Sequence, residues 1–561
     1  MVTSALAGPL PEETDVLVVG GGPTGLAAMV ELGRRGVHCT VVEPRVDVSG
    51  TRPRAKTTSI RTMEHFRRWG LARTLREASY LPVSWSQDIV FCVNLLGPEV
   101  ARFTGCFGMT TERDDRFAET SQQVPQFVVE GVLREAVGQL PACRTAFGWR
   151  ATGVVERDDD VLVELRDGDG RRHRIASRYV VGCDGAASVV RGAIGAAYRG
   201  SVETRQNVTA VFRAPGLAER VPHGAAIQYW VLQPGASAYM GRLDLDDRWW
   251  IGLIDVGAGL SDADVCSHIE AAVGGSLAVE LIGTDPWVGR TLNADRYATG
   301  RVLLAGDAAH LNPPWGGHGF NTGIGDAVNG AWKVAAALEG WGGPHLVGSY
   351  AEERRPVVEE TIALAGHHAN LLSADFADPL LLQQTPEGAA TRRRAGHEIE
   401  RVKHDEFHAL GLVLGYHYEG SAIVCGGPRS ARPLDVSRYR PTAAPGHRLP
   451  HAWLAPGVSL YDRLGEWFTV VRTGDGDPGP LAAAAATRGL PVTVLDLRRH
   501  GLDLGAPLVL VRPDQHVAWR GDGTPEEVAW VVDTVRGARA AAPAASAPTE
   551  PVPSNRHRPV A

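Results

Sequence analysis

Residues 15 to 25 read Asp15-Val-Leu-Val-Val-Gly20-Gly-Gly22-Pro-Thr-Gly25. The apolar run predicts a buried strand that ends at Gly20, and Pro23 predicts the first turn of a helix, where proline is favoured. In such a unit Gly20 makes the tight turn, Gly22 lets the backbone approach a pyrophosphate, and Gly25 lets the helix pack closely on the strand. The pyrophosphate would lie at the helix N-terminus, where free N–H groups and the helix dipole attract an anion.

A second strand is expected over 38–43, and it ends at Glu43, 18 residues past Gly25. This spacing is close to that at which a carboxylate reaches the ribose of a bound dinucleotide. Because strand, glycines, helix and acid are all present, a chance glycine-rich turn is the less favoured alternative. The sequence therefore predicts a Rossmann-like dinucleotide-binding fold near its N-terminus.

A second glycine-rich turn, Arg301-Val-Leu-Leu-Ala-Gly306-Asp307, lies 286 residues after Gly20 and leads into Pro313-Pro314-Trp315-Gly316-Gly317-His318-Gly319-Phe320-Asn321. Two such turns, each with an acidic residue, predict that one cofactor is held by two distant parts of the chain. They favour a flavin over a free nicotinamide. His310 follows Asp307 closely, and we interpret it as a residue that fastens the loop rather than as a catalytic group.

The composition is that of a globular enzyme. The chain has 561 residues, a net charge of −7, 44% hydrophobic and 22% charged residues, so two or three domains are expected. There is no basic block to suggest a nucleic-acid partner, no apolar run of membrane-spanning length and no signal-peptide pattern. The seven cysteines are scattered without a CxxC, which predicts reduced thiols, a cytoplasmic location and no metal site.

Hydrophobic periodicity divides the chain into several parts. The predicted cofactor-binding domain is discontinuous and comprises 13–77, 121–195 and 295–375. A substrate domain is expected from 78–120 and 196–294, with a mostly antiparallel sheet whose strands include 208–213, 226–233, 237–244 and 248–254. A helical connector is predicted over 376–434, a further domain over 435–536, and a disordered tail over 537–561.

A third turn lies between the other two, at Tyr179-Val-Val-Gly182-Cys-Asp184-Gly185, with Arg191 following. In this order the three motifs resemble those of the group A FAD-dependent aromatic hydroxylases, the para-hydroxybenzoate hydroxylase superfamily. The stretches Pro445-Gly-His-Arg448-Leu-Pro450 and Leu510-Val-Arg-Pro513-Asp514 are similar to the phenol-hydroxylase-like and actinobacterial polyketide hydroxylase subgroup. The resemblance covers residues 13 to 535. It implies an α/β (α+β overall) protein with a Rossmann-like FAD-binding domain, an inserted substrate domain and a thioredoxin-like C-terminal domain that lacks CxxC.

The resemblance implies FAD as the cofactor and NADPH or NADH as a co-substrate. Asp307 would bind the ribityl chain, and the backbone N–H groups of 319–321 would face the flavin O2 edge. Arg54, in Arg52-Pro-Arg54-Ala, would lie near the cofactor and influence flavin movement. The full set implied at FAD is Gly20, Gly22, Gly25, Glu43, Arg54, Gln126, Asp184, Asp307, Gly319, Phe320 and Asn321.

The implied reaction transfers one oxygen atom from a C4a-hydroperoxyflavin to a phenolic natural product or polyketide, with NAD(P)H and O2 consumed. Pro314, His318 and Arg54 are the expected catalytic residues, and no acid or base is assigned. Candidates for the substrate pocket are Tyr229, Tyr239, Arg242, Trp315 and His318. The pairs Tyr229-Trp230 and Trp249-Trp250 fit a core or a substrate platform equally well.

Several alternatives stay open at this point. A Baeyer–Villiger or epoxidising monooxygenase has the same fold, and so does a non-oxygenase FAD dehydrogenase. The sequence also leaves open which phenol and ring position are used, the choice between NADPH and NADH, and whether the chain forms a homo-oligomer.

Overall fold

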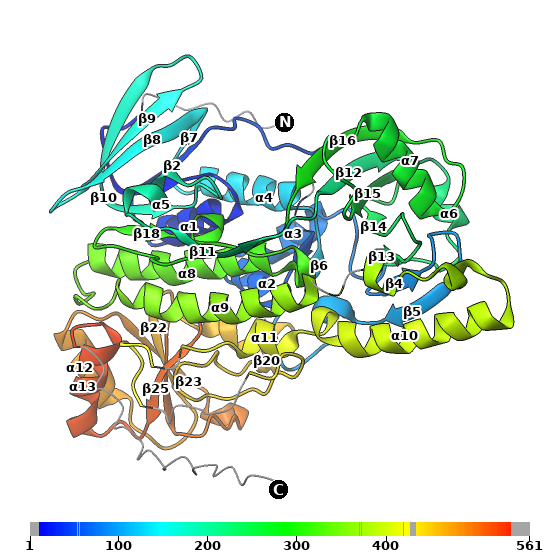
Figure 1. The fold of residues 1–561 in the computed structure, drawn as a ribbon. Coiled ribbons are helices and arrows are strands. Elements are labelled where there is room, and N and C mark those ends of the chain that lie inside the picture. Colours follow the sequence, from blue (N-terminus) through cyan, green and yellow to red (C-terminus); the bar gives the residue numbers. More distant parts are fainter. Residues whose placement is uncertain are drawn as a thin grey trace, which may run out of the picture.

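The protein, seen in a computed structural model, is described over residues 10–539 except 53, 55, 370, 372, 419 and 427–433. A mixed, mainly parallel sheet and a second large sheet lie side by side, and a C-terminal unit packs below the long helices of the first part (Figure 1). Most of the predicted disordered tail, 540–561, lies outside the described residues.

The first sheet has the order β7-β2-β1-β10, with β18 paired to β10, and all these pairings are parallel. The other half of β10 pairs with β9 and then β8 as an antiparallel extension, with a tight turn at Asp167-Gly-Asp-Gly170 between β9 and β10. The strands are β1 (Glu13–Val19), β2 (Cys39–Glu43), β7 (Cys143–Phe147), β8 (Trp149–Glu156), β9 (Val161–Asp167), β10 (Arg172–Gly182) and β18 (Val302–Leu304).

Helices surround this sheet, and α1 contacts both α4 and α8. Its apolar residues, such as Leu26 and Met29, are fully buried in the same core as Val16 and Val18 of β1. The helices of this part are α1 (Pro23–Arg34), α2 (Ile60–Arg68), α3 (Ala72–Ala78), α4 (Gln126–Gly138), α5 (Val189–Ala193), α8 (His318–Leu338) and α9 (Ser349–Ala369).

The second sheet has seven strands in the order β16-β12-β15-β14-β13-β4-β5, antiparallel except for β13 with β4. Strands from the segment 78–120 thus join strands from 196–294, as predicted. The strands are β4 (Ile89–Cys92), β5 (Glu99–Phe103), β12 (Asn207–Arg213), β13 (Gln228–Val231), β14 (Ala238–Arg242), β15 (Arg248–Leu253) and β16 (Glu280–Trp287).

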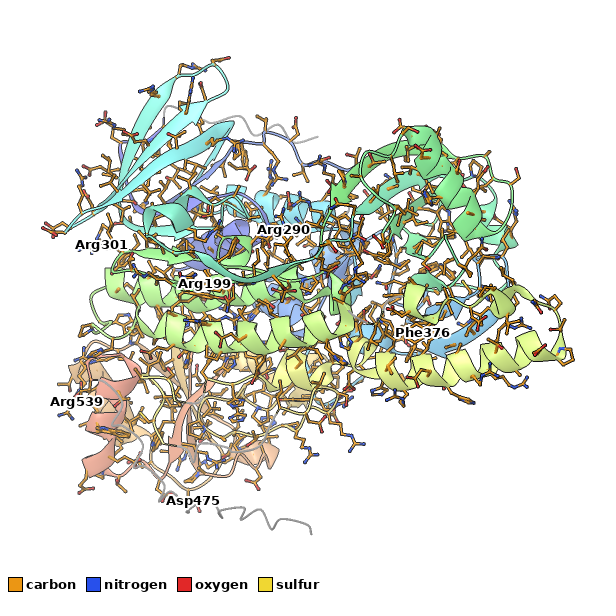
Figure 2. The ribbon with its side chains drawn as sticks, in the orientation of Figure 1. Arg199, Arg290, Arg301, Phe376, Asp475 and Arg539 are labelled. Atoms are coloured by element: carbon orange, nitrogen blue, oxygen red, sulfur yellow. The ribbon has the colours of Figure 1, made fainter. Side chains whose placement is uncertain are left out.

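The two faces of this sheet pack against different elements. One face forms a core with α7 (Asp262–Val273), and the other packs against α10 (Pro386–Phe407) and the loop at Trp315. Phe376, labelled in Figure 2, lies on this second side near α10. Shorter elements link the parts: α6 (Leu217–Arg220), α11 (Leu410–Gly415), β3 (Thr57–Thr58), β6 (Gln122–Gln123), β11 (Tyr198–Val202), β17 (Arg290–Ala294) and β19 (His310–Leu311).

The C-terminal unit is a four-stranded sheet, β23-β22-β24-β25, with two helices packed together. Buried ion pairs attach it to α8 and α9, because Arg512 donates to Glu353 at 2.6 and 2.7 Å and Lys333 donates to the same carboxylate at 2.7 Å. The elements are β20 (Trp453–Ala455), β21 (Val458–Ser459), β22 (Phe468–Arg472), α12 (Gly479–Thr487), β23 (Val492–Asp496), β24 (Leu508–Val511), β25 (Val517–Gly521) and α13 (Pro525–Val535). No helix in the described ranges has the length and apolarity needed to cross a membrane.

Candidate active site

The first glycine turn has the geometry that the sequence predicts. Gly20 has φ +106°, and a Cβ there would overlap the carbonyl of Cys183. A Cβ on Gly25 would overlap the Gly20 carbonyl. Gly22 is the N-cap of α1, no side chain caps that helix, and a Cβ at Gly22 would meet no heavy atom within 4 Å. Open space above an uncapped helix start fits a pyrophosphate group.

Glu43 ends β2 beside this turn and is almost fully buried. Its Oε2 accepts a hydrogen bond from the Gly21 N–H at 2.8 Å, and its Oε1 accepts one from the Arg45 guanidinium at 2.7 Å. The carboxylate therefore lies next to the glycine turn, where the predicted contact with the adenosine ribose is possible. That contact stays a prediction.

The second glycine turn packs directly against the first helix. A Cβ on Gly306 would lie 2.6 Å from Thr24 Oγ1, and one on Gly323 would lie 2.5 Å from the same atom. Thr24 is in the first turn of α1. The structure thus brings together the two turns that lie 286 residues apart in the sequence.

Asp307 lies in this second turn with its side chain accessible to solvent but recessed among protein groups. Desolvation raises the pKa of its carboxyl group, against the opposing effect of His310, Arg54 and Arg290. Arg54 is therefore close enough to Asp307 to interact electrostatically, and it has a left-handed backbone with φ 42°. An accessible carboxylate that accepts no hydrogen bond from the described residues fits the predicted ribityl ligand.

A buried network of hydrogen bonds and ion pairs around Asp326 fixes the loop that carries Asp307. His310 Nε2 lies 2.7 Å from Asp326 Oδ2, which also accepts from the Gly306 N–H at 3.1 Å. Arg354 Nε donates to the other Asp326 oxygen at 2.8 Å. Since His310 is 1% exposed and engaged in this network, the geometry supports its interpretation as a residue that fastens the loop.

The third turn is attached to the second. The Arg191 guanidinium donates to the carbonyl of Ala308 at 3.1 Å, and the Tyr198 hydroxyl donates to the carbonyl of Asp307. Asp184 accepts from the Ser188 hydroxyl at 2.5 Å and from the Val189 N–H at 2.7 Å, so its carboxylate caps the start of α5. This capping role is an addition to the predicted cofactor contact of Asp184, which stays a prediction.

The start of α8 provides the last part of the cofactor side. Gly316 and Gly317 have left-handed backbone conformations, with φ 73° and 68°. Gly317 is the N-cap residue of α8, and no side chain caps this helix. Asn321 holds this end in place, because its amide donates to the Thr57 carbonyl at 3.0 Å and accepts from the Ser59 N–H at 2.9 Å. The helix N-terminus next to Gly319 and Phe320 could thus face an anionic flavin edge, and the predicted contact stays a prediction.

Two further predicted residues lie at the margins of this region. Gln126 begins α4, and its amide donates to Glu130 at 2.9 Å. Pro314 precedes the short turn at Trp315 and is exposed. Their predicted roles stay predictions.

An aromatic cluster covers the face of the second sheet that looks toward Trp315. The ring of Tyr239 lies 5.5 Å from Trp230, 5.4 Å from Trp250 and 5.4 Å from Trp315, measured between ring centroids. Trp230 and Tyr239 are direct cross-strand neighbours in β13 and β14. The structure therefore brings the predicted Tyr239 and Trp315 together, with Trp230 and Trp250 beside them.

Tyr229 and Arg242 are not part of this face, which corrects their placement in the substrate pocket. Successive strand residues point to opposite sides of a sheet. Tyr229 is buried in the core under α7, where its hydroxyl donates to the Gly224 carbonyl. The Arg242 guanidinium lies over the ring of Trp249 on that same side and donates to the Asp244 carbonyl at 2.9 Å. The alternation of the strand sequences could have separated Trp230 from Tyr229 and Trp250 from Trp249.

His318 is buried at the start of α8, and its Nε2 has no hydrogen-bond partner among the described residues. Burial lowers its pKa to about 4, with a further contribution from His368. His318 is therefore a neutral imidazole near neutral pH. The imidazole could therefore exchange a hydrogen bond with a bound molecule, but it carries no charge there.

Lys56 is a site residue that the sequence analysis missed. It lies just before β3, and its Nζ is 4.0 Å from the centroid of the Trp250 ring. The available signal was its rarity, because the chain has only three lysines, Lys56, Lys333 and Lys403.

Comparison with known proteins agrees with this geometry. An FAD-binding domain model matches residues 13–365, and a model of the C-terminal domain of aromatic-ring hydroxylases matches residues 442–539. The tetracenomycin B2 monooxygenase-dioxygenase of Streptomyces olivaceus is 33% identical, over 93% of this chain and 98% of that protein.

Two solved structures are similar over nearly the whole chain. The rebeccamycin biosynthetic enzyme RebC with reduced flavin has a TM-score of 0.86 and 35% identity, covering 94% of this chain and 100% of that one. The flavin-dependent monooxygenase PieE in complex with FAD and substrate has a TM-score of 0.85 and 31% identity, covering 94% and 99%. The chain described here therefore belongs to the family of FAD-dependent aromatic-ring hydroxylases, which are flavoprotein monooxygenases.

Proposed function

We propose that this protein uses FAD, NAD(P)H and O2 to hydroxylate a phenolic ring of a natural product of the polyketide kind. The observation that carries the proposal is the segment from Pro314 to His318. It ends at the helix start that fits the flavin edge, and its Trp315 packs into the aromatic cluster. When bound, FAD accepts a hydride from the nicotinamide and activates O2 for transfer of one oxygen atom.

The protein's own residues bind and orient the cofactor. The turn at Gly20 to Gly25 holds the pyrophosphate, Glu43 the ribose and Asp307 the ribityl chain. The uncapped start of α8 stabilises negative charge on the flavin ring, because its N–H groups are fixed in place before any charge develops.

The substrate side excludes water. Trp230, Tyr239 and Trp315 are all less than 9% exposed, so the ring to be hydroxylated would lie among apolar surfaces. A face of several large aromatic side chains suits a flat, fused-ring ligand, which can stack on them. Two similar proteins, a tetracenomycin B2 monooxygenase-dioxygenase and a rebeccamycin biosynthetic enzyme, are named for natural products, which supports a substrate of that kind.

The test uses the purified FAD-containing protein with NADPH or NADH and a set of mono- and polycyclic phenols. We expect phenol-dependent O2 uptake and a product heavier by one oxygen atom on an aromatic ring. The same protein depleted of FAD is the control and should show neither. A ring-expanded lactone would indicate a Baeyer–Villiger oxygenase, an epoxide an epoxidising enzyme, and an oxidised product without added oxygen a dehydrogenase.

A further inference from the structure

The three lysines of this arginine-rich chain differ in burial and in their partners, because Lys333 and Lys403 are fully buried and Lys56 is half-buried. Lys333 donates to Glu353 at 2.7 Å, and Lys403 donates to Glu406 at 2.6 Å, with both lysines fully buried. Lys56 has no carboxylate partner among the described residues. Its Nζ donates one hydrogen bond, to the Arg54 carbonyl at 2.8 Å, and two of its three donor positions remain.

The groups around Lys56 share one chemical property. Its ammonium lies over the face of the Trp250 indole, and the Nε1–H of that indole is buried with no acceptor in the described part of the chain. The Nε1–H of Trp315, on the far side of Tyr239, is also buried and without an acceptor there. The cluster thus presents a cation, unused donors and flat apolar rings. An aromatic molecule that carries an anionic oxygen complements all three.

A second lysine on this face, Lys403, lies 4.7 Å from the centroid of the Trp230 ring, but its charge is paired with Glu406. Arg52 is paired with Asp285 of β16 at 3.7 Å, and Arg54 has an exposed side chain. The residue after Lys56, Thr57, is hydrogen-bonded to two uncharged side chains, Gln123 of β6 and Asn321 of α8.

The remaining titratable groups on this face are neutral or already paired. The charge of Glu406 is taken by Lys403, and His318 is neutral. Burial raises the pKa of the Tyr239 hydroxyl, so this tyrosine stays protonated and cannot act as a base. Burial lowers the pKa of Lys56 to about 7, which places a substantial share of this lysine in the neutral amine form near neutral pH. A lysine in that range can accept a proton, whereas an arginine in proteins cannot.

We propose that Lys56 receives the proton of the substrate's phenolic hydroxyl and holds the resulting phenolate. The O–H bond of the phenol breaks, an N–H bond forms on the amine, and an ammonium–phenolate pair remains over Trp250. No oxidant or reductant takes part. The inference rests on the proposed hydroxylation and narrows its substrates to phenols that ionise on binding, because ionisation makes the ring richer in electrons at the carbon to be oxygenated.

The test measures the ionisation of a bound phenol in the FAD-containing protein, without NADPH and under argon. The probes are 4-nitrophenol and alizarin, whose phenolates absorb at longer wavelength than their neutral forms. Difference spectra across pH give the affinity of each form. We expect the wild type to bind the phenolate preferentially. Lys56→Met should lower phenolate affinity about ten- to a hundredfold, a shift of about one to two pH units in the apparent pKa of the bound probe, and leave neutral-phenol affinity unchanged.

Two further variants separate this role from a general effect. Lys56→Arg keeps the cation and should retain phenolate binding. Arg52→Gln removes a nearby exposed charge and should leave the probe's ionisation as in the wild type. Flavin content and thermal unfolding of each variant show that it is folded.

Equal phenolate affinity in Lys56→Met and the wild type would overturn the proposal. So would a preference of the wild type for the neutral form, or a wild type that binds neither probe. Because the measurement needs no turnover, a probe that ionises at Lys56 in a protein that hydroxylates no phenol would refute the proposed function alone.

Discussion

The cofactor side and the substrate side of this protein are built by different means. On the cofactor side, the surface is formed mainly by backbone turns at strand ends. At Gly20, Gly25 and Gly306 these turns leave no room for a side chain. On the substrate side, large side chains from alternate strand positions form the surface. A backbone cradle tolerates almost no change at its glycines, whereas an aromatic face tolerates the exchange of one ring for another. Mutations of the glycines on the cofactor side should therefore cause large losses of FAD affinity or stability. Mutations of the aromatic residues on the substrate side should cause smaller losses of phenol affinity.

Gly25→Ala should give the largest effect. A Cβ there overlaps the carbonyl of Gly20, so α1 must shift away from β1 at a cost of about 1–3 kcal/mol or more in the free energy of unfolding. The protein should purify without FAD and unfold at lower temperature.

Gly22→Ala is the matched control for Gly25→Ala. A Cβ at Gly22 meets nothing within 4 Å, and its backbone suits alanine, so the FAD-free protein should keep its thermal stability. FAD affinity should nevertheless fall, because the methyl group would occupy the space above the helix start. Full FAD affinity in Gly22→Ala would show that the pyrophosphate does not approach this turn.

Asp307→Ala should weaken FAD binding about ten- to a hundredfold, or about 1.5–3 kcal/mol, through loss of a charged acceptor. Equilibrium dialysis or flavin fluorescence gives the affinity. Asp307→Asn, which keeps an acceptor, should lose less. Unchanged flavin retention in Asp307→Ala at low protein concentration would exclude the carboxylate as a ligand.

The stability of the FAD-free protein should respond in the opposite sense. The folded-state pKa of Asp307 is raised, so its ionised form opposes folding at pH values above its ordinary pKa, about 4. Asp307→Ala should thus leave the free energy of unfolding equal or higher at neutral pH. A loss of stability would show that this carboxylate supports the fold rather than the cofactor.

Trp250→Phe, compared with Trp249→Phe, should give the smallest effect and tests the substrate side. Both indoles are buried in β15 and both N–H groups lack acceptors in the described residues, but they face opposite sides of the sheet. Both variants should lose similar stability. Only Trp250→Phe should weaken phenol binding, about two- to tenfold, as expected for loss of one aromatic contact. Equal binding losses in both would contradict the assignment of the two faces.

The same difference explains which parts of the site could be predicted from the sequence. The glycine turns are local, because each needs a strand, a glycine and a helix within a short stretch, and the structure has them at the predicted places. The pocket depends on which face of a strand a residue occupies and on what packs there. Tyr229 and Arg242 were placed in the pocket by position alone, and the structure puts them under α7. Lys56 and Trp250 lie far apart in the sequence, so no local pattern reveals their contact.

The most direct test of the account is to supply the purified protein with NADPH, a phenol that it binds and heavy-isotope oxygen gas in ordinary water. Mass spectrometry of the product then shows the source of the new oxygen atom. The account predicts one heavy oxygen atom on the aromatic ring for each phenol converted. A hydroxylated product whose oxygen comes from water, or NADPH oxidation that leaves every tested phenol unchanged, would contradict it.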